Sequence, residues 1–336
     1  MSEDSKKRVL SCIQPTGEIH LGNYFGALKN WVEMQSKYEC IYGVVDLHAM
    51  TVTYNPGELH QATRQMFIDL LACGIDLSKC ILFVQSLIPE HAELTWIFSC
   101  LTSYGELTRQ TQFKDKSSKQ NDSSDGFISV GLFSYPVLQA ADILIYRANY
   151  VPVGQDQQQH LELSRNIAER FNSRFGDFFP LPETKFTATP KVMSTADPNS
   201  KMSKSLGDKH WIGLFEEEKV IRKKIARAVT DSGQTEDGKM SPGVQNLIEI
   251  LKASENHETA QSFVRDFNRG ELRYSDLKGE TADALVEMTA PLKKRRKELS
   301  EDLEQIDKNI REMSEQARMI AKKTMKGVRE MIGVGF

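Results

Sequence analysis

The sequence predicts an α/β fold, in which a Rossmann-like, doubly wound parallel sheet of five strands is followed by an α-helical domain. Over the first two-thirds of the chain, short apolar or β-branched runs alternate with segments of helical periodicity, the pattern of parallel strands joined by crossover helices. Beyond about Trp211 the strand-like runs disappear, and acidic residues are interleaved with basic ones. A length of 336 residues suits two domains, which we place at residues 1–212 and 213–336.

The five strands are predicted at residues 8–13, 40–45, 80–85, 150–153 and 191–194. The first strand leads through a turn into a helix, because apolar residues recur at helical spacing at Phe25, Leu28 and Trp31. A second helix is predicted at residues 59–71, behind an Asn-Pro-Gly turn, and a third begins near Asp156. Helices between parallel strands are the arrangement of a doubly wound sheet.

Two further segments have a distinctive composition. No apolar residue lies between Phe113 and Phe127, so we expect residues 114–126 to form an exposed, mobile loop. In the second domain we expect a long helix to begin at Pro291, with i,i+4 pairs such as Lys294 with Glu298.

Composition and charge exclude several classes of protein. The chain is 40% hydrophobic and 26% charged, which is average for a globular protein and unlike a disordered or fibrous one. No apolar run approaches the roughly 18 residues of a membrane span, and residues 1–8 lack the apolar core of a signal peptide. We therefore expect a cytoplasmic protein. The five cysteines include no Cys-x-x-Cys pair, so we expect buried free thiols and no structural metal.

The segment His20-Leu21-Gly22-Asn23 lies where the first strand gives way to the first helix. A helix N-terminus presents unpaired N–H groups that bind phosphate oxygens, and a glycine there lets a nucleotide approach the backbone. His20 can donate a hydrogen bond to a phosphate. The alternative is an ordinary turn, with a glycine that serves packing and a histidine that happens to be exposed.

The segment Lys201-Met202-Ser203-Lys204-Ser205 is bracketed by turn-forming residues and is predicted to be a flexible loop. Two lysines three residues apart, with hydroxyl groups beside them, can surround a polyphosphate and offset the charge that develops as pyrophosphate departs. The alternative is a solvated basic loop. Average residue frequencies produce this pentapeptide by chance in only about one chain in ten thousand, so the nucleotide-binding interpretation is favoured.

With these two motifs the chain resembles the class I aminoacyl-tRNA synthetases, and among them the bacterial and mitochondrial tryptophanyl-tRNA synthetases. The resemblance extends over most of the first 235 residues, through residues 11–17, 44–49, 135–144, 151–160 and 228–232. It implies a ligase that uses ATP, with Mg²⁺ bound to it, to convert L-tryptophan into tryptophanyl-adenylate and pyrophosphate. The acyl group then passes to the 3′ end of tRNA(Trp). The family also implies a homodimer.

The resemblance implies a set of nucleotide-binding residues. His20, Asn23, Lys201 and Lys204 are the expected catalytic residues. The expected ATP contacts are Gln14, Pro15, Thr16, Gly22, Asn23, Gly154, Gln155, Asp156, Val192, Lys201, Met202, Ser203, Lys204 and Ser205. Gln155 departs from the family pattern, because many relatives carry Glu at this position.

A tryptophan pocket needs one hydrogen-bond acceptor among apolar walls, because indole offers a single N–H on an apolar bicycle. Asp142 matches the family's acceptor; by itself it would equally suit a helix cap or an ion pair. The resemblance implies that the residues around it line the pocket or bind the α-amino group: Tyr135, Gln139, Val45, His48, Val151, Val153 and Gln157. Gln139 replaces a methionine found in some relatives.

The densest basic cluster comprises Lys293, Lys294, Arg295, Arg296 and Lys297, and a second group follows at Lys322, Lys323, Lys326 and Arg329. Neighbouring acidic residues make a solvated helix face one interpretation. Because the family's anticodon-binding domain occupies this region, binding of tRNA phosphates is the other.

Three alternative functions remain at this point. A tyrosine-specific relative shares the fold and both ATP motifs, but residues 151–160 and the single acceptor Asp142 disfavour it. An adenylate-forming paralogue that does not charge tRNA is disfavoured by the full-length helical region. A structural nucleotide-binding protein would not need both Lys201 and Lys204.

Overall fold

The computed structural model describes residues 6–110, 128–152, 154, 157–185, 192–231 and 239–335. Within them five parallel strands form one sheet in the order β3-β2-β1-β4-β5. The strands are β1 (Arg8–Ile13), β2 (Glu39–Val44), β3 (Cys80–Val84), β4 (Tyr150–Val151) and β5 (Glu183–Thr184). This confirms the predicted doubly wound fold. The predicted loop at 114–126 lies outside the described residues.

The fifth strand is not the predicted one. β5 lies at Glu183–Thr184, whereas Met193 forms only an isolated antiparallel bridge with Lys201. β5 is a short edge strand with no apolar residue, so hydrophobic periodicity cannot detect it. The apolar run at 192–193 has another cause, because Val192 is buried against residues 201–205, which we call the lysine loop, and not within the sheet.

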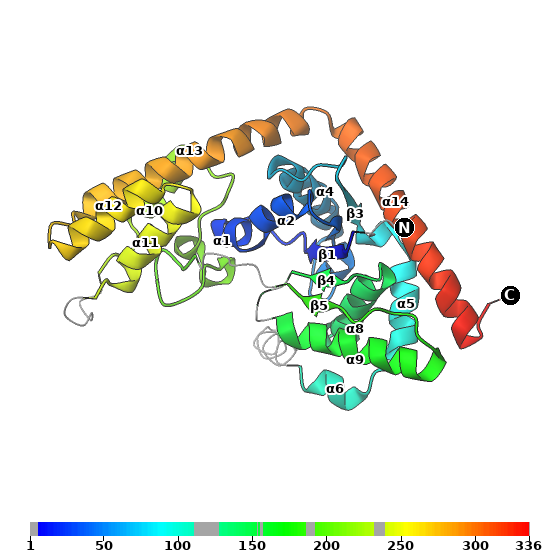
Figure 1. Ribbon diagram of the computed structural model, residues 1–336. Helices are drawn as coiled ribbons and strands as arrows, with labels where there is room; N and C mark the ends of the chain where they lie inside the picture. Colours follow the sequence, from blue (N-terminus) through cyan, green and yellow to red (C-terminus); the bar gives the residue numbers. More distant parts are fainter. Residues whose placement is uncertain are drawn as a thin grey trace, which may run out of the picture.

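Helices cover both faces of the sheet (Figure 1). One face carries α1 (Leu21–Asn23), a π-helical turn (Tyr24–Leu28), α2 (Lys29–Met34) and α4 (Pro56–Ala72). The other carries α5 (Glu90–Ser99), α8 (Val130–Ile145) and α9 (Gln158–Phe175), with α6 (Tyr104–Thr108) beside α8. Successive strand residues enter opposite cores: Val9 packs in the first and Leu10 in the second. The predicted helices at 59–71 and near residue 156 correspond to α4 and α9.

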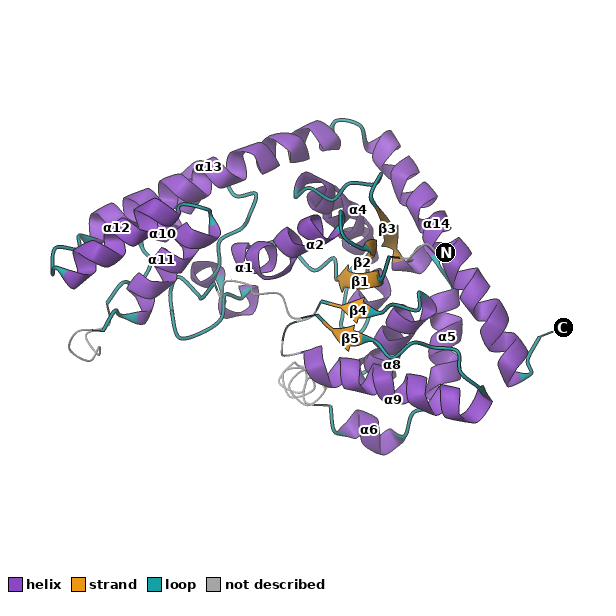
Figure 2. Cartoon of the chain, in the orientation of Figure 1, coloured by secondary structure: helices purple, strands orange, loops and turns teal. Residues whose placement is uncertain are grey.

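The remaining helices are α10 (Glu218–Ala226), α11 (Pro242–Ala253), α12 (His257–Asn268), α13 (Tyr274–Ser300) and α14 (Leu303–Ile332). α10 and α11 pack on α13, which runs across the top of the sheet domain (Figure 2). The prediction that a helix begins at Pro291 was wrong, because Pro291 lies inside α13. Proline most often marks a first helical turn, and here it is an exposed residue in an already long helix.

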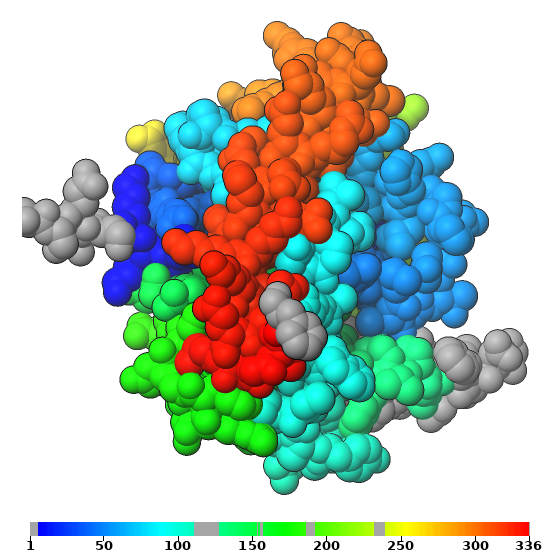
Figure 3. All heavy atoms as spheres, turned by 90° about the vertical axis from the view of Figure 1, so that its right-hand side faces the viewer, coloured from blue at the N-terminus to red at the C-terminus, as the bar shows by residue number. Residues whose placement is uncertain are grey.

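α14 turns back and covers the edge strand β3. The Ser314 hydroxyl accepts a hydrogen bond from the Val84 N–H at 3.0 Å, and Ala317, Ala321 and Met325 join the core of the sheet domain. Figure 3 shows α14 lying across this face of the molecule, over α5. An edge strand covered in this way cannot pair with another chain. The domain boundary at residue 212 stays a prediction.

Two expectations from composition concern the whole chain. No helix in the described ranges is long and apolar enough to cross a membrane. All five cysteines are free: Cys40, Cys73 and Cys80 are buried and Cys12 is half-buried, but Cys100 is exposed, contrary to the expectation of buried thiols.

An ion pair joins α13 to α4. Arg296 donates from Nε to Asp69 Oδ1 at 2.8 Å, and its guanidinium lies 4.4 Å from the centre of the Phe215 ring. Burial raises the pKa of Asp69, an effect that the Arg296 charge opposes. Arg296, predicted for tRNA binding, is therefore engaged in holding the helical region to the sheet domain.

We expect Arg296→Met to lower the apparent free energy of unfolding in urea by roughly 2 to 3 kcal/mol, because it leaves the buried Asp69 carboxylate without its cation. The matched control is Lys294→Met on the same helix, where the lysine side chain is 80% exposed and should matter little. Equal effects of the two substitutions would contradict a structural role for Arg296.

Candidate active site

His20 is held at the start of α1 by a reciprocal pair of hydrogen bonds. Its Nδ1 accepts from the Asn23 N–H at 3.3 Å, and the Asn23 side-chain oxygen accepts from the His20 N–H at 3.2 Å. Because Nδ1 is the acceptor, the proton of the neutral ring resides on Nε2. His20 can thus offer one N–H donor while Asn23 fixes its orientation.

The His20 ring is buried and lies near two cations. Burial, followed by the charges of Lys204 and Lys201, lowers the pKa of His20 to about 4. The ring is therefore neutral at pH 7. Gly22 completes this corner: a Cβ there would lie 2.9 Å from the His20 ring, so any other residue would displace the ring.

The lysine loop folds back onto the turn that precedes His20. Lys204 Nζ donates to the Thr16 carbonyl at 2.6 Å and to the Glu18 carbonyl at 2.9 Å, and burial lowers its pKa. Gly17, between these carbonyls, has φ +72°, a conformation that favours glycine. Lys201 stays exposed. The two motifs, far apart in sequence, therefore meet at the carboxyl end of β1.

Two buried groups anchor the loop. The Met202 side chain is 3% exposed, and its N–H donates to the Val192 carbonyl at 3.4 Å. The carboxamide of Asn246, on α11, forms two hydrogen bonds with the backbone of Met193, one with its N–H at 2.9 Å and one with its carbonyl at 3.1 Å. Sequence analysis did not identify Asn246, since an asparagine within a helix carries no distinguishing pattern.

Asp142, on α8, is the centre of a second cluster and is only 3% exposed. Its carboxylate has three hydrogen-bond partners: His48 Nε2 at 2.7 Å, Gln85 Nε2 at 2.7 Å and His91 Nδ1 at 2.6 Å. Burial alone would raise the pKa of Asp142, but the hydrogen bonds from His48 and His91 hold it well below its usual range. Asp142 is an ionised acceptor inside the protein.

Sequence analysis missed Gln85 and His91. Both are fully buried, and each resembles an ordinary core residue in the sequence. One usable signal was available for Gln85, which directly follows strand β3. Side chains at the carboxyl ends of parallel strands gather at one edge of the sheet, where ligands bind.

Tyr135 and three other side chains lie beside the Asp142 cluster. The Tyr135 hydroxyl is 3.0 Å from His160 Nε2, and His160 Nδ1 is 2.9 Å from Gln157 Oε1. Gln139 donates to the same Gln157 oxygen at 3.4 Å. The His48 and Tyr135 rings are edge to face, with centroids 6.3 Å apart. The structure thus brings together four of the predicted pocket residues around Asp142.

The other predicted residues have simpler surroundings. Val45 and Val151 are buried, Val45 directly after β2 and Val151 in β4. The Gln14 backbone carbonyl accepts a hydrogen bond from the Thr16 N–H at 2.9 Å in a tight turn. Pro15 is buried and Gly154 is exposed, and the Ser203 and Ser205 hydroxyls pair at 3.0 Å. Val153, Gln155 and Asp156 lie outside the described residues.

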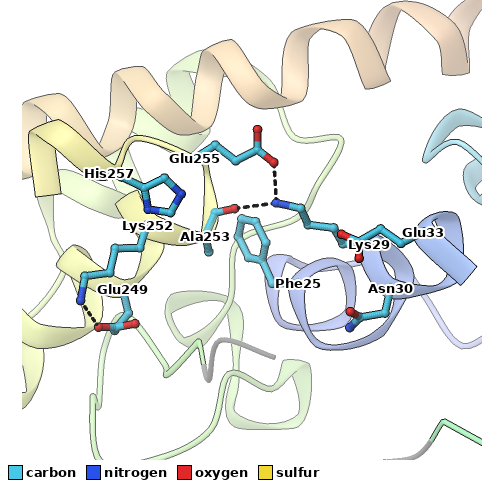
Figure 4. Close-up of a pocket in the computed structure, with 9 residues that line it drawn as sticks. All are labelled: Phe25, Lys29, Asn30, Glu33, Glu249, Lys252, Ala253, Glu255 and His257. Atoms are coloured by element: carbon cyan, nitrogen blue, oxygen red, sulfur yellow. Dashed lines mark hydrogen bonds and ion pairs between the residues drawn. The ribbon is translucent and has the colours of Figure 1, made fainter. Parts of the chain in front are cut away.

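A groove of about 600 Å³ lies apart from all these residues, between α2 and the end of α11 (Figure 4). Lys29 crosses it and donates to the Ala253 carbonyl at 3.3 Å and to Glu255 at 2.8 Å, while Lys252 pairs with Glu249. A cation at the carboxyl end of a helix is stabilising. Lys29 therefore connects the helical region to the sheet domain across this groove.

The model of the class I tRNA synthetases for tryptophan and tyrosine matches residues 2–290. The chain belongs to this family. It is 44% identical over 333 residues to tryptophan–tRNA ligase 2 of Streptomyces avermitilis, covering 98% of this chain and 97% of the relative. It is 43% identical over 334 residues to the tryptophan–tRNA ligase of Clostridium tetani, with the same coverage.

Solved structures of the family agree with the fold. The tryptophanyl-tRNA synthetase of Campylobacter jejuni complexed with ADP and tryptophan is 34% identical, with a TM-score of 0.83, covering 97% of this chain and 100% of that one. The enzyme of Mycoplasma pneumoniae is 34% identical, with a TM-score of 0.86 and 98% coverage of both. A tyrosyl-tRNA synthetase from Archaeoglobus fulgidus, at 21% identity and a TM-score of 0.66, with 88% of this chain and 91% of that one covered, shares the fold.

We expect the His20 ring of the free enzyme to stay neutral down to pH values near 4. As the pH falls, the unfolded chain, in which histidine has a pKa of about 6.5, binds this proton before the folded protein does. The stability that neutral His20 contributes is therefore fully present above a pH of about 6.5 and is lost as the pH falls toward about 4. NMR titration of the ring proton, assigned by its loss in His20→Gln, measures this pKa. A midpoint near 6.5 would refute the prediction.

Proposed function

We propose that this chain is a tryptophan–tRNA ligase, which activates L-tryptophan with ATP and transfers the tryptophanyl group to the 3′ end of tRNA(Trp). The observation that carries the proposal is the meeting of two sites at the carboxyl edge of the sheet. Lys204 and His20 form a cationic, donor-bearing corner, and Asp142 forms a buried acceptor. The full-length similarity to two tryptophan–tRNA ligases supports the choice of amino acid.

ATP enters as its magnesium complex, with metal ligands that are mainly phosphate oxygens and water. Among the described residues no group of three His, Cys, Asp or Glu side chains is arranged to hold a metal. The proposed ATP contacts are those expected from the sequence, in residues 14–16, 22–23, 154–156, 192 and 201–205. His20 Nε2–H and the exposed Lys201 then face the phosphates.

Activation requires little acid–base chemistry from the protein. The tryptophan carboxylate is already ionised at neutral pH and attacks the α-phosphorus of ATP; the bond from that phosphorus to the bridging oxygen breaks, and pyrophosphate carries away the negative charge. Catalysis therefore consists of positioning and charge stabilisation. Lys204 exchanges its two carbonyl acceptors for phosphate oxygens as this charge develops.

The amino-acid pocket follows from the unused acceptor capacity of Asp142. An ionised carboxylate offers about four acceptor positions, and the described residues fill three of them, two on Oδ1 and one on Oδ2. We assign the indole N–H to the fourth position, on Oδ2 beside His48. Tyr135 and Gln157 bind the α-amino group, with Gln139, Val45, Val151 and Val153 as walls.

The helical region is the proposed tRNA-binding domain. On α13, Lys294, Arg295 and Lys297 are exposed, whereas Lys293 donates to the Glu216 carbonyl at 2.8 Å and Arg296 holds Asp69. The three exposed residues are therefore the candidates for phosphate contacts. Substitution of these residues should leave pyrophosphate exchange unchanged. It should weaken tRNA binding, by an amount that depends on the salt concentration.

The enzyme is proposed to act as a homodimer in the cytoplasm. Trp96, Tyr104 and Val130 are 72%, 75% and 79% exposed, and they lie on α5, α6 and α8, of which α5 and α6 both pack on α8. Large exposed apolar side chains on neighbouring elements are typical of an interface. A monomeric mass in solution at micromolar concentration would contradict this assignment.

The decisive measurement is amino-acid-dependent exchange of pyrophosphate into ATP, followed by charging of tRNA. We expect exchange with tryptophan and none with tyrosine, then charging of tRNA(Trp). Exchange with tyrosine alone would replace the main proposal with the tyrosine-specific one. Exchange without charging would indicate an adenylate-forming paralogue.

Lys204→Ala should slow adenylate formation by about 10²-fold, since it removes one preorganised donor to developing charge. The dissociation constant of tryptophan should change little, because Lys204 lies at the Thr16 and Glu18 carbonyls and not at Asp142. Single-turnover adenylate formation and equilibrium tryptophan binding separate the two effects. Equal losses in both would show that Lys204 is only structural.

A further inference from the structure

Three buried side chains on the Oδ1 side of Asp142 are assigned no contact with substrate in the proposed function. Gln85, His91 and Tyr146 are each 0% exposed, and with Asp142 they form what we call the Asp142 network. His91 Nδ1 lies 2.6 Å from Asp142 Oδ1, and His91 Nε2 lies 2.8 Å from the Tyr146 hydroxyl. Gln85 Nε2 donates to the same Asp142 oxygen at 2.7 Å. The presence of these hydrogen-bonded polar side chains in the core requires an explanation in addition to packing.

The directions of these hydrogen bonds are determined by their surroundings. Asp142 is ionised and can only accept, so His91 Nδ1 carries a proton and donates it. The Gln85 oxygen accepts from the Leu47 N–H at 3.2 Å, which directs its NH₂ group toward Asp142. Two donors therefore fill Oδ1, whereas Oδ2 has His48 alone among the described residues.

The network is also held rigidly from outside. The His91 ring stacks on Phe83 of β3, with ring centroids 5.6 Å apart. Glu90, the preceding residue, receives Arg318 of α14, with Nε 3.1 Å from both carboxylate oxygens. The position of His91 thus depends on an edge strand and on the C-terminal helix. Within the described structure, the His91 ring forms hydrogen bonds only with Asp142 and Tyr146.

We propose that His91, held by Tyr146, is a positioning residue that determines specificity for a ring N–H. By filling Oδ1 it keeps Asp142 oriented, with Oδ2 directed at the substrate. A substrate side chain of the same shape that lacks the N–H then leaves this buried acceptor unsatisfied, and the substrate binds more weakly for that reason. Without His91 the carboxylate can reorient, and the difference in binding free energy between tryptophan and such an analogue becomes smaller. The inference rests on the proposed function.

The test compares L-tryptophan with β-(benzothiophen-3-yl)alanine, in which sulfur replaces the ring N–H. The readout is the ratio of kcat/KM for the two substrates in pyrophosphate exchange. The wild-type enzyme should favour tryptophan by roughly 10²-fold. His91→Phe should lower this ratio by about tenfold, chiefly through a higher KM for tryptophan. Tyr146→Phe removes only one oxygen and should lower the ratio by about threefold.

Two further variants complete the design. His91→Asn retains a donor near the Nδ1 position and should recover part of the ratio. Ser99→Ala, on the same helix but outside the network, should leave the ratio unchanged. Should His91→Phe fail to fold, Tyr146→Phe decides the matter, because it preserves the ring and the packing.

The outcomes are distinguishable. Absence of tryptophan-dependent exchange in the wild type would overturn the proposed function. Exchange with a wild-type preference for tryptophan that persists unchanged in His91→Phe and Tyr146→Phe would overturn this inference alone. A loss of kcat/KM shared equally by both substrates would also overturn it, since that is the result of general structural damage.

Discussion

The burial of one negative charge, on Asp142, is the constraint on which the arrangement of the sheet's carboxyl edge depends. A carboxylate that is 3% exposed must be surrounded by donors, or it would cost several kcal/mol. Its donors come from three separate segments: His48 on α3 (Asp46–Ala49), Gln85 at the end of β3 and His91 on α5. The parallel sheet makes this possible, because all its strands end at the same edge.

The corner that holds Lys204 and His20, the proposed phosphate site, is built by the opposite means, from cations that are only partly satisfied. Lys204 donates hydrogen bonds to two backbone carbonyls. These are neutral acceptors, so a charged phosphate oxygen can replace them. Its charge and that of Lys201 help keep His20 neutral, so the histidine contributes a donor without adding to the repulsion among cations. Asn246 connects this corner to α11 through Met193. A displacement of the helical region would therefore shift the lysine loop as well.

Sequence analysis predicted what depends on local pattern. Strands β1, β2 and β3 are apolar runs, and the motifs around His20 and Lys204 have residue types that phosphate chemistry requires. β5 escaped prediction because edge strands need no apolar residues, and Pro291 misled because a long helix on α10 and α11 tolerates one missing hydrogen bond. Gln85, His91 and the ion pair of Arg296 with Asp69 depend on contacts between distant segments, which one sequence does not reveal.

The departure at Gln139 illustrates how such contacts decide the effect of a substitution. A glutamine in place of methionine brings a carboxamide to the wall of the proposed amino-acid pocket, where an unpaired polar group would be unfavourable. Here its NH₂ group donates to Gln157 Oε1 at 3.4 Å, the same oxygen that lies 2.9 Å from His160 Nδ1. His160 in turn contacts the Tyr135 hydroxyl. The added polarity is thus directed toward α9 and away from Asp142, which leaves Oδ2 as the acceptor proposed to face the substrate.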